Sequence, residues 1–255
     1  MIFYFSATGN CKHVALRIAS EIKDEPIAIS DCVKKQEFLF EVEDQEKIGF
    51  VIPVYFWGLP SIACEFLEKM KLRMPDSHRP YIYHVATFGT TTGQAGHIVN
   101  EILKGKGLSL NGRFSVQMPD TWTPVFDLTH KEKIKKINHH AEKQIAAVTE
   151  KIKRGLAGDF SSRKVPMAAV KLYYPTYEKA RETKHFTVED SCIGCSLCAK
   201  KCSVSAIEMQ EGRPVWVKEK CALCLGCLHH CPTFAIQYGK KTKKHGQYVN
   251  PNVKV

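Results

Sequence analysis

Several features are absent from this sequence of 255 residues, and each absence narrows the class of protein. No apolar run approaches the roughly 20 residues that a membrane-spanning helix needs. The opening ten residues lack the basic start and long apolar stretch of a secretory signal peptide. Neither the lysine motif GxxxxGK[ST] nor the motif GxGxxG occurs, so a P-loop nucleoside triphosphatase and a dinucleotide-binding fold are not indicated. We therefore expect a cytoplasmic protein with reduced thiols.

Positive charge is in excess, but the excess is moderate. The chain carries 37 Lys and Arg against 26 Asp and Glu, a formal net charge of +11. Basic residues gather at 131–136, at 151–154 and in a tail at 240–244. Such runs are usually solvated faces, and the functional alternative is steering of an acidic partner protein or an anionic substrate. No recognised binding motif accompanies the charge, so nucleic acid is not expected as a partner.

Cysteine is abundant, and eight of the eleven cysteines fall in two near-identical runs with the spacing CxxCxxCxxxC. Iron–sulfide cubes need soft anionic ligands, and cysteine thiolate is the common side chain that supplies them. In this spacing three cysteines of a run ligate one [4Fe–4S] cluster and the fourth ligates the other cluster. The predicted ligands are Cys192, Cys195, Cys198 and Cys231 for one cluster, and Cys221, Cys224, Cys227 and Cys202 for the other.

Other uses of these cysteines fit the spacing less well. Structural zinc sites use two CxxC pairs, whereas each run here is a triplet followed by a fourth cysteine. Packed triplets could not all reach partners at disulfide geometry. One position departs from the iron–sulfur pattern, because Ser203 follows Cys202 where Pro232 follows Cys231. We expect the Ser203 hydroxyl to add a hydrogen bond near a cluster sulfur, without preventing ligation. On these motifs, residues 186–239 resemble a bacterial-type ferredoxin with two [4Fe–4S] clusters, a small α+β domain.

The N-terminal region begins with an anion-binding pattern. A short apolar strand at 2–5 runs into the turn Ser6-Ala7-Thr8-Gly9-Asn10 and then into a helical pattern over 14–22. Backbone N–H groups at the helix start carry partial positive charge, and hydroxyls of Ser6 and Thr8 are further donors. A phosphate would therefore bind at this turn, which we call the SATGN loop (residues 6–10).

The pattern then alternates between strands and helices. Further strands are predicted at 26–29, 48–54, 81–86 and 113–118, and further helices at 61–70, 93–103 and 131–152. Five strands alternating with helices indicate an α/β fold, a parallel sheet covered on both faces. In such sheets, ligands bind at the carboxyl ends of the strands, where the strand order switches.

The loops that follow these strands predict a ring site beside the phosphate site. The aromatic loop (residues 55–58) is Tyr-Phe-Trp-Gly, a glycine- and hydroxyl-rich turn follows at 87–93, and 119–122 ends in tryptophan. Adjacent aromatics alone are evenly balanced between core packing and binding, and their place after a strand favours binding. A flat ring with a phosphate at one end describes flavin mononucleotide (FMN).

Here the chain resembles flavodoxin over residues 1–155. The resemblance implies a doubly wound five-stranded parallel sheet in the order 2-1-3-4-5, phosphate contacts from the SATGN loop and ring contacts from the later loops. Cys11 stands where the family has a hydroxyl residue, so one phosphate hydrogen bond is lost or comes from the backbone. The predicted cofactor residues are Ser6, Thr8, Gly9, Asn10, Cys11, Tyr55, Phe56, Trp57, Gly58, Thr87, Phe88, Gly89 and Trp122.

Several nearby residues have an ordinary structural interpretation. Asp120 is either the cap of a following turn, which we favour, or a proton donor near flavin N5. Trp122 contacts the flavin or the junction between domains. We expect His139-His140 to face solvent on a helix and His229-His230 to point outward from the second cysteine run, and assign neither pair a metal. The remaining cysteines are Cys11, Cys32 and Cys64, which we expect to be buried small residues rather than catalysts.

The complete chain resembles the flavodoxin–ferredoxin fusion family of anaerobic microbes. The expected division is an FMN domain at 1–156, a packed linker at 157–185, a two-cluster domain at 186–240 and a basic tail at 241–255. The resemblance implies an electron-transfer oxidoreductase that exchanges electrons with an acidic redox protein, such as a ferredoxin, a flavodoxin or a low-potential reductase. One alternative is an FMN-dependent reductase of a small acceptor, such as a quinone, nitro compound or free flavin. A second alternative is a redox sensor or scaffold.

Overall fold

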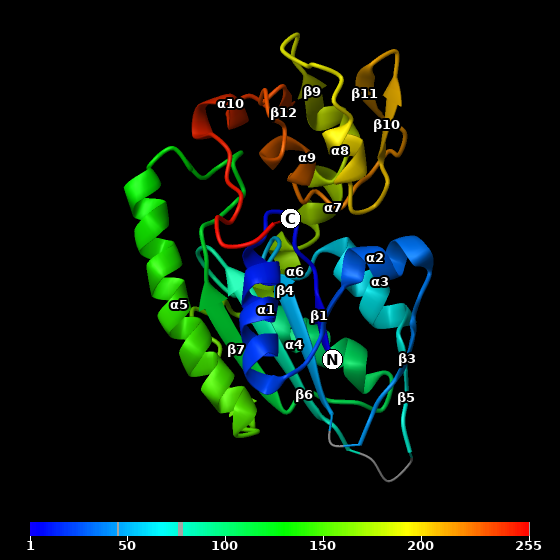
Figure 1. Cartoon of the computed structure of the whole chain (residues 1–255), viewed down its shortest axis with the longest axis vertical. Coiled ribbons are helices and arrows are strands. Elements are labelled where there is room, and N and C mark those ends of the chain that lie inside the picture. The colour runs from blue at the N-terminus through cyan, green and yellow to red at the C-terminus, as the bar shows by residue number, and fades with distance from the viewer. Residues whose placement is uncertain (45, 76–78, 255) are drawn as a thin grey trace.

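Six parallel strands form the central sheet of the N-terminal lobe in the computed structural model, which describes residues 1–44, 46–75 and 79–254 (Figure 1). The strand order within these residues is β2-β1-β4-β6-β7-β8, and each neighbouring pair is parallel. The strands are β1 (Ile2–Tyr4), β2 (Pro26–Ala28), β4 (Lys47–Pro53), β6 (Tyr81–Phe88), β7 (Gly112–Gln117) and β8 (Gly158–Asp159).

The α/β fold and the order of the five predicted strands are confirmed, but the predicted strand count is too low. The sheet gains β8, which pairs with the start of β7 through residues 112–113. Both residues of β8 are exposed, so this edge strand carries no alternation of apolar and polar residues. A second short parallel pair, β3 (Leu39–Glu41) with β5 (Lys71–Arg73), was also not anticipated, because Leu39 and Glu41 are exposed.

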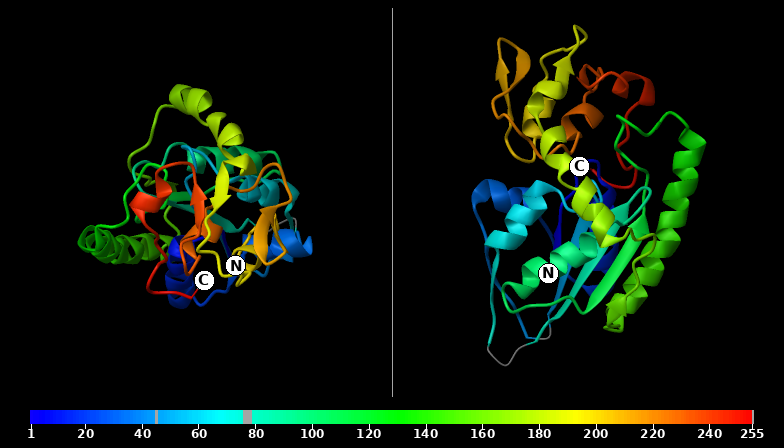
Figure 2. Two further views of the ribbon diagram at one scale, coloured as in Figure 1. Left: turned by 90° about the horizontal axis from the view of Figure 1, so that it is seen from above. Right: turned by 180° about the vertical axis from the view of Figure 1, so that it is seen from behind.

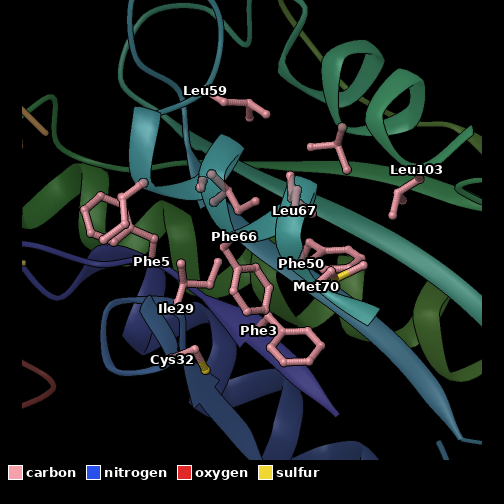
Figure 3. Packing of buried hydrophobic residues seen from close by; sticks show 14 of the residues in the cluster. Phe3, Phe5, Ile29, Cys32, Phe50, Leu59, Phe66, Leu67, Met70 and Leu103 are labelled. Atoms are coloured by element: carbon pink, nitrogen blue, oxygen red, sulfur yellow. The ribbon is translucent and has the colours of Figure 1, made fainter. Parts of the chain in front are cut away.

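Helices cover both faces of the sheet, as Figures 1 and 2 show. On one face, apolar residues of the first and last long helices, such as Val14, Ile18 and Ile145, pack on Ile2 and Val85 of the sheet. The opposite face has its own core, in which Phe3, Phe50 and Phe66 lie against one another (Figure 3). The helices are α1 (Asn10–Ile22), α2 (Ile29–Lys35), α3 (Ser61–Lys69), α4 (Ala95–Lys104) and α5 (Lys131–Lys153).

The C-terminal lobe contains the two cysteine runs and lies over the carboxyl ends of the sheet strands (Figure 1). Each cysteine triplet leads into a one-turn helix, and the residue before each helix, Ser196 or Leu225, adopts the left-handed conformation. Its elements are β9 (Phe186–Val188), α8 (Leu197–Lys200), β10 (Ile207–Gln210), β11 (Arg213–Trp216), α9 (Gly226–His229), β12 (Ile236–Tyr238) and α10 (Thr242–His245). The strands pair antiparallel, β9 with β12 and β10 with β11.

The segment between the lobes packs against both of them. It contains α6 (Met167–Tyr173), α7 (Thr176–Ala180) and the 3-10 turn η1 (Thr183–His185). The buried Tyr177 hydroxyl donates to the carbonyl of Ala222 at 2.6 Å and accepts from the backbone N–H of Ser61 at 3.2 Å. Tyr174 donates to the carbonyl of Leu59 at 2.7 Å. These bonds tie the start of α3 to the second cysteine run.

The last segment, 241–254, returns to the N-terminal lobe and is held there. Thr242, Tyr248 and Asn250 are buried, although the sequence pattern describes this region as a basic tail. Position 255 of the predicted tail lies outside the described residues. Among the helices that the structure describes, none has the length and apolar character to span a bilayer.

Candidate functional site

A cavity of about 240 Å³ lies at the carboxyl ends of the sheet strands, next to the switch in strand order between β1 and β4. Eleven of the thirteen predicted cofactor residues line this cavity: Ser6, Thr8, Asn10, Cys11, Tyr55, Phe56, Trp57, Thr87, Phe88, Gly89 and Trp122. The two glycines Gly9 and Gly58 are outside its described lining. Gly58 has a packing role instead, because a Cβ there would lie 2.5 Å from the ring of Tyr174.

Gly9 does not line the cavity but forms the turn between the SATGN loop and α1. Its φ of 95° places it in the left-handed region, which favours glycine, and it caps α1. Its N–H donates to Ser6 Oγ at 3.1 Å. Its carbonyl accepts the first bond of the helix, from the N–H of His13 at 2.8 Å. The loop therefore turns directly into the N-terminus of α1, the geometry that favours anions.

The side chains of Asn10 and Cys11 are used within the protein. Asn10 donates to the carbonyl of Pro119 at 3.2 Å and accepts from Tyr248 and Asn250 at 3.0 and 3.1 Å. The Cys11 thiol lies 2.9 Å from the Thr87 hydroxyl, and burial raises its pKa to about 12. Both side chains are therefore engaged within the protein. The donors that positions 10 and 11 offer to an anion are their backbone N–H groups.

The aromatic loop is a tight turn with two residues in the left-handed region, Phe56 at φ 49° and Trp57 at φ 66°. The ring of Phe56 lies 5.5 Å from that of Trp122 and stacks at 5.6 Å on Tyr173. Tyr173 also lines the cavity, and sequence reasoning missed it because it lies in the segment between the lobes. Trp122 additionally lies 5.5 Å from Tyr238 of the C-terminal lobe, so it contacts both the cavity and the junction.

Asp120 lines the cavity opposite a glycine. Its Oδ1 accepts from the N–H of Trp122 at 3.1 Å, which is the turn-capping role that we favoured. A Cβ added to Gly89 would lie 2.2 Å from Asp120 Oδ2, so only glycine permits this close approach. Burial raises the pKa of Asp120 to about 6, although the bond from Trp122 acts in the opposite direction.

Four cysteines from both runs line a second, smaller cavity in the C-terminal lobe. We call them the outer cysteine set: Cys192, Cys195, Cys198 and Cys231. Cys195 is exposed and its neighbour Ile193 is 65% exposed, so this set lies near the surface. The backbone N–H of Ala235 donates to Cys231 Sγ at 3.2 Å, and the Thr233 hydroxyl lies 3.7 Å from it.

The other four cysteines form the inner cysteine set: Cys202, Cys221, Cys224 and Cys227. Their thiols lie within electrostatic reach of one another. Three of the four are buried, and burial raises the pKa of Cys221 to about 12. Sulfurs of this set accept hydrogen bonds from backbone N–H groups, from Ala206 to Cys202 at 3.1 Å and from Leu223 to Cys221 at 3.3 Å.

The arrangement of the two sets differs from that of a site for a single metal ion. In the described residues, no group of three or more Cys, His, Asp or Glu side chains converges closely enough to hold one metal ion. A cube spreads its four thiolates around a larger centre than a zinc ion does. Each set draws its fourth cysteine from the other run, as the spacing predicts. Iron coordination would deprotonate these thiols outright, which overcomes the pKa increase that burial causes.

The inner set reaches the large cavity. Cys224 and its neighbours Leu223 and Leu225 belong to the cavity lining, together with the SATGN and aromatic loops. A Cβ on Gly226 would lie 3.7 Å from both Cys224 Sγ and Ala7 Cβ, so this run and the SATGN loop are in contact. The Ser203 hydroxyl lies 3.6 Å from Cys224 Sγ, which confirms the hydrogen bond expected at that position.

The expectation that His229 and His230 point outward is wrong. His229 is buried, its Nε2 donates to the carbonyl of Thr121 at 2.9 Å, and its Nδ1 accepts from the N–H of Tyr248 at 3.2 Å. His230 Nε2 donates to the carbonyl of Ala7 at 2.9 Å. Sequence reasoning missed this role because a pair of histidines carries no signal of what packs above it. His139 and His140 are exposed on α5, as expected.

Of the three cysteines outside the two runs, Cys11 and Cys32 are buried as predicted. Cys64 is half-buried instead, with its sulfur 3.7 Å from the hydroxyl of Tyr174. Tyr174 belongs to the segment between the lobes. This segment therefore covers the Cys64 thiol on the apolar side of α3.

A cavity at the switch point of a doubly wound parallel sheet, bounded by a helix N-terminus, is where proteins of this α/β class bind their ligands. A family model described as flavodoxin domain matches residues 1–146, more than half of the chain, and the chain therefore belongs to the flavodoxin domain family.

Curated relatives match a shorter stretch of 62 residues. One is an uncharacterized polyferredoxin-like protein of Methanocaldococcus jannaschii, 40% identical over 19% of this chain and 37% of that protein. Another is a component of the ion-translocating oxidoreductase complex of Methanosarcina acetivorans, 36% identical over 24% of this chain and 23% of that protein. The chain thus spans less than two fifths of the length of either relative.

Two solved structures have a distant similarity to part of this chain. The two-electron reduced flavodoxin of Megasphaera elsdenii has a TM-score of 0.34 and 15% identity, covering 56% of this chain and 99% of that one. The rubredoxin oxygen:oxidoreductase of Desulfovibrio gigas has a TM-score of 0.32 and 14% identity, covering 59% of this chain and 36% of that one.

Proposed function

We propose that this chain is an electron-transfer oxidoreductase that passes electrons between an external one-electron carrier, two [4Fe–4S] clusters and FMN. The observation that carries the proposal is the position of Cys224. It belongs to the inner cysteine set and also lines the cavity bounded by the SATGN loop and the aromatic loop. FMN exchanges one or two electrons and a cluster exchanges one, so their contact suits conversion between the two kinds of chemistry.

The residues of the large cavity fit FMN. Ser6 and Thr8 hydroxyls and the N–H groups at the start of α1 would hold the phosphate. Phe56, Trp57 and Trp122 would border the ring, and the side chain opposite Gly89 is a carboxyl rather than a bulky apolar group. Membership of the flavodoxin domain family supports the same cofactor.

The difference in exposure between the cysteine sets supports an order of electron flow. The outer set, with exposed Cys195, would exchange electrons with the external carrier, and the inner set would exchange them with FMN. The similarity of the chain to a polyferredoxin-like protein supports clusters at these cysteines. The net charge of +11 favours an acidic carrier, such as a ferredoxin, a flavodoxin or a low-potential reductase.

An anaerobic optical titration of the purified chain tests the proposal, after iron, sulfide and FMN have been quantified. We expect about eight irons and about one FMN per chain, because two cubes and one phosphate cavity are proposed. A low-potential donor should bleach both chromophores, and a candidate acceptor should restore them. Clusters without flavin would contradict the role of the cavity, and bound zinc without sulfide would contradict the clusters.

A second candidate, an FMN-dependent reductase of a small acceptor, is favoured by the rim of the cavity. Val125 and Tyr173 belong to the lining and are 60% and 38% exposed, so the cavity opens to solvent between apolar side chains. Quinones, nitro compounds and free flavins are planar and apolar enough to enter such a mouth. Steady-state turnover with these acceptors, after reduction through the clusters, would distinguish this function from exchange with a protein carrier.

A further inference from the structure

The SATGN loop directs two consecutive peptide carbonyls to donors from the far end of the chain. The carbonyl of Ala7 accepts from His230 Nε2 at 2.9 Å. The carbonyl of Thr8 accepts from the backbone N–H of Asn250 at 2.7 Å. His230 lies in the second cysteine run, and Asn250 lies in the last segment of the chain. The C-terminal lobe therefore supplies the partners of the loop that bounds the phosphate end of the cavity.

These bonds determine where the loop's N–H groups point. In a trans peptide unit the C=O and the following N–H lie in one plane and point in opposite directions. Holding the Ala7 carbonyl toward His230 therefore directs the Thr8 N–H away from His230, and Thr8 lines the cavity. Holding the Thr8 carbonyl fixes the Gly9 N–H in the same way, and that N–H donates to Ser6 Oγ. The anion-binding form of the loop thus depends on both donors.

A second set of bonds fixes the side of the loop that joins α1. Asn250 Nδ2 donates to Asn10 Oδ1 at 3.1 Å, and the Tyr248 hydroxyl donates to the same oxygen at 3.0 Å. The side chains of these three residues are buried, so the loss of either donor removes one of the two hydrogen bonds to a buried acceptor. His229, next to His230, holds the loop at 119–122 through Thr121.

We propose that His230 and Asn250 are positioning residues that set the affinity for the phosphate group of FMN. The C-terminal lobe completes the phosphate site without touching the phosphate, by holding the SATGN loop with its carbonyls turned outward. This inference rests on the proposed function, in which the cavity binds FMN. Because binding free energies are reciprocal, FMN binding also stabilises the contact between the loop and the inner cysteine set.

Flavin titrations of the complete, cluster-containing chain test the inference. The probes are FMN and riboflavin, which share the ring but differ in the phosphate, and binding is followed by flavin fluorescence under anaerobic conditions. We expect His230→Leu to weaken FMN binding about tenfold, since one hydrogen bond with an unsatisfied acceptor is lost. Riboflavin binding should change by less than about twofold, and iron and sulfide content should stay at wild-type values.

Three further variants sharpen the result. His230→Gln retains an N–H donor at the place of Nε2 and should restore FMN affinity to within about threefold of wild type. Asn250→Ala keeps its backbone N–H but loses the side-chain bonds to Asn10 and to the N–H of Asn252, so about a threefold loss is expected. His139→Leu is the matched control, because His139 is exposed on α5 and should leave both affinities unchanged.

The outcomes are separable. Equal FMN affinity in wild type and His230→Leu overturns the inference and leaves the proposed function intact. A parallel loss of FMN and riboflavin, or a loss of iron that glutamine does not rescue, also overturns it, because the residue would then support the fold rather than the phosphate site. Failure of the wild-type chain to bind FMN overturns the proposed function itself.

Discussion

The two cysteine sets have nearly the same spacing in sequence but very different surroundings. In the outer set, Cys195 is exposed and Ile193 beside it is 65% exposed. In the inner set, Cys221 and Cys227 are buried and Cys224 borders the large cavity. The difference arises from what packs on each set, since Cys224 of the inner set borders the same cavity as the SATGN loop, whereas the lining of the outer set comes from the C-terminal lobe. Near-identical cysteine spacing therefore does not specify the surroundings of a set, which tertiary packing decides.

Removing one ligand from each set should give the largest contrast. We expect Cys198→Ser to lose the outer cluster, about half of the iron, and to retain FMN, because the outer set does not reach the large cavity. Cys227→Ser should lose the inner cluster and bind FMN at least about tenfold more weakly, since His229 and His230 lie two and three positions after it. Iron analysis, electron paramagnetic resonance and FMN titration of both variants test this. Equal FMN retention would contradict the contrast.

The carboxyl of Asp120, beside the large cavity, should make stability depend on pH in a way that an exposed carboxyl near the outer cysteine set does not. Burial raises its pKa from 3.8 to about 6, so the folded state binds the proton more tightly than the unfolded state. The contribution of Asp120 to stability is therefore greatest below pH 4 and is lost as the pH rises from about 4 through about 6, by up to about 3 kcal/mol. Asp120→Asn removes this decline and keeps the bond from Trp122, so the variant should exceed wild type in stability at pH 8 and match it near pH 4.

Thermal unfolding of FMN-free protein under anaerobic conditions, at several pH values, measures this effect. Asp190→Asn is the control, because the Asp190 side chain in the outer region is fully exposed to solvent. Its stability curve should follow that of wild type. A constant difference between Asp120→Asn and wild type at all pH values would show that the carboxyl does not titrate with folding.

Two hydroxyls allow the potentials of the clusters to be shifted separately. Ser203 lies 3.6 Å from Cys224 of the inner set, and Thr233 lies 3.7 Å from Cys231 of the outer set. Hydrogen bonds to cluster sulfurs stabilise the reduced, more negative state. We expect Ser203→Ala to lower only the inner potential, by about 40 mV for a bond of about 1 kcal/mol. Thr233→Val should lower only the outer potential, and redox titration with spectroscopic detection would resolve the two.

A shift of both potentials in either variant would contradict the assignment of Cys224 and Cys231 to opposite sets. The same measurement would also identify which cluster exchanges electrons with FMN, because only the inner potential should respond when FMN is added.

Sequence patterns predicted the elements that have a local signal. The spacing of the cysteines predicted that the fourth cysteine of a run lies with the triplet of the other run, and alternating apolar segments predicted five strands, whose order the flavodoxin resemblance implied. The SATGN turn predicted one end of the cavity because strand, turn and helix are adjacent in the chain. The edge strand β8 was missed, since its exposed residues lack periodicity.

The contacts between lobes were beyond prediction for a different physical reason. His230, Asn250 and Tyr173 act on loops more than one hundred residues away, and nothing within a window of ten residues indicates their partners. Asn10 shows the same limit, because its side-chain amide has the chemistry of a phosphate donor but donates to the carbonyl of Pro119. The type of a residue predicts which hydrogen bonds its side chain can make, whereas contacts between distant parts of the chain decide which of them it does make.

The bond between Asn250 and Asn10 also has a consequence for biosynthesis. The two residues are 240 positions apart, so at about 5–20 residues per second the ribosome produces the second at least ~12 s after the first. During that interval the sheet and α1 have been synthesised, but the SATGN loop lacks the donors that direct its carbonyls. A nascent chain that binds FMN as proposed would therefore bind it more weakly until the cysteine runs have emerged, so that tight flavin binding coincides with the completion of the electron route.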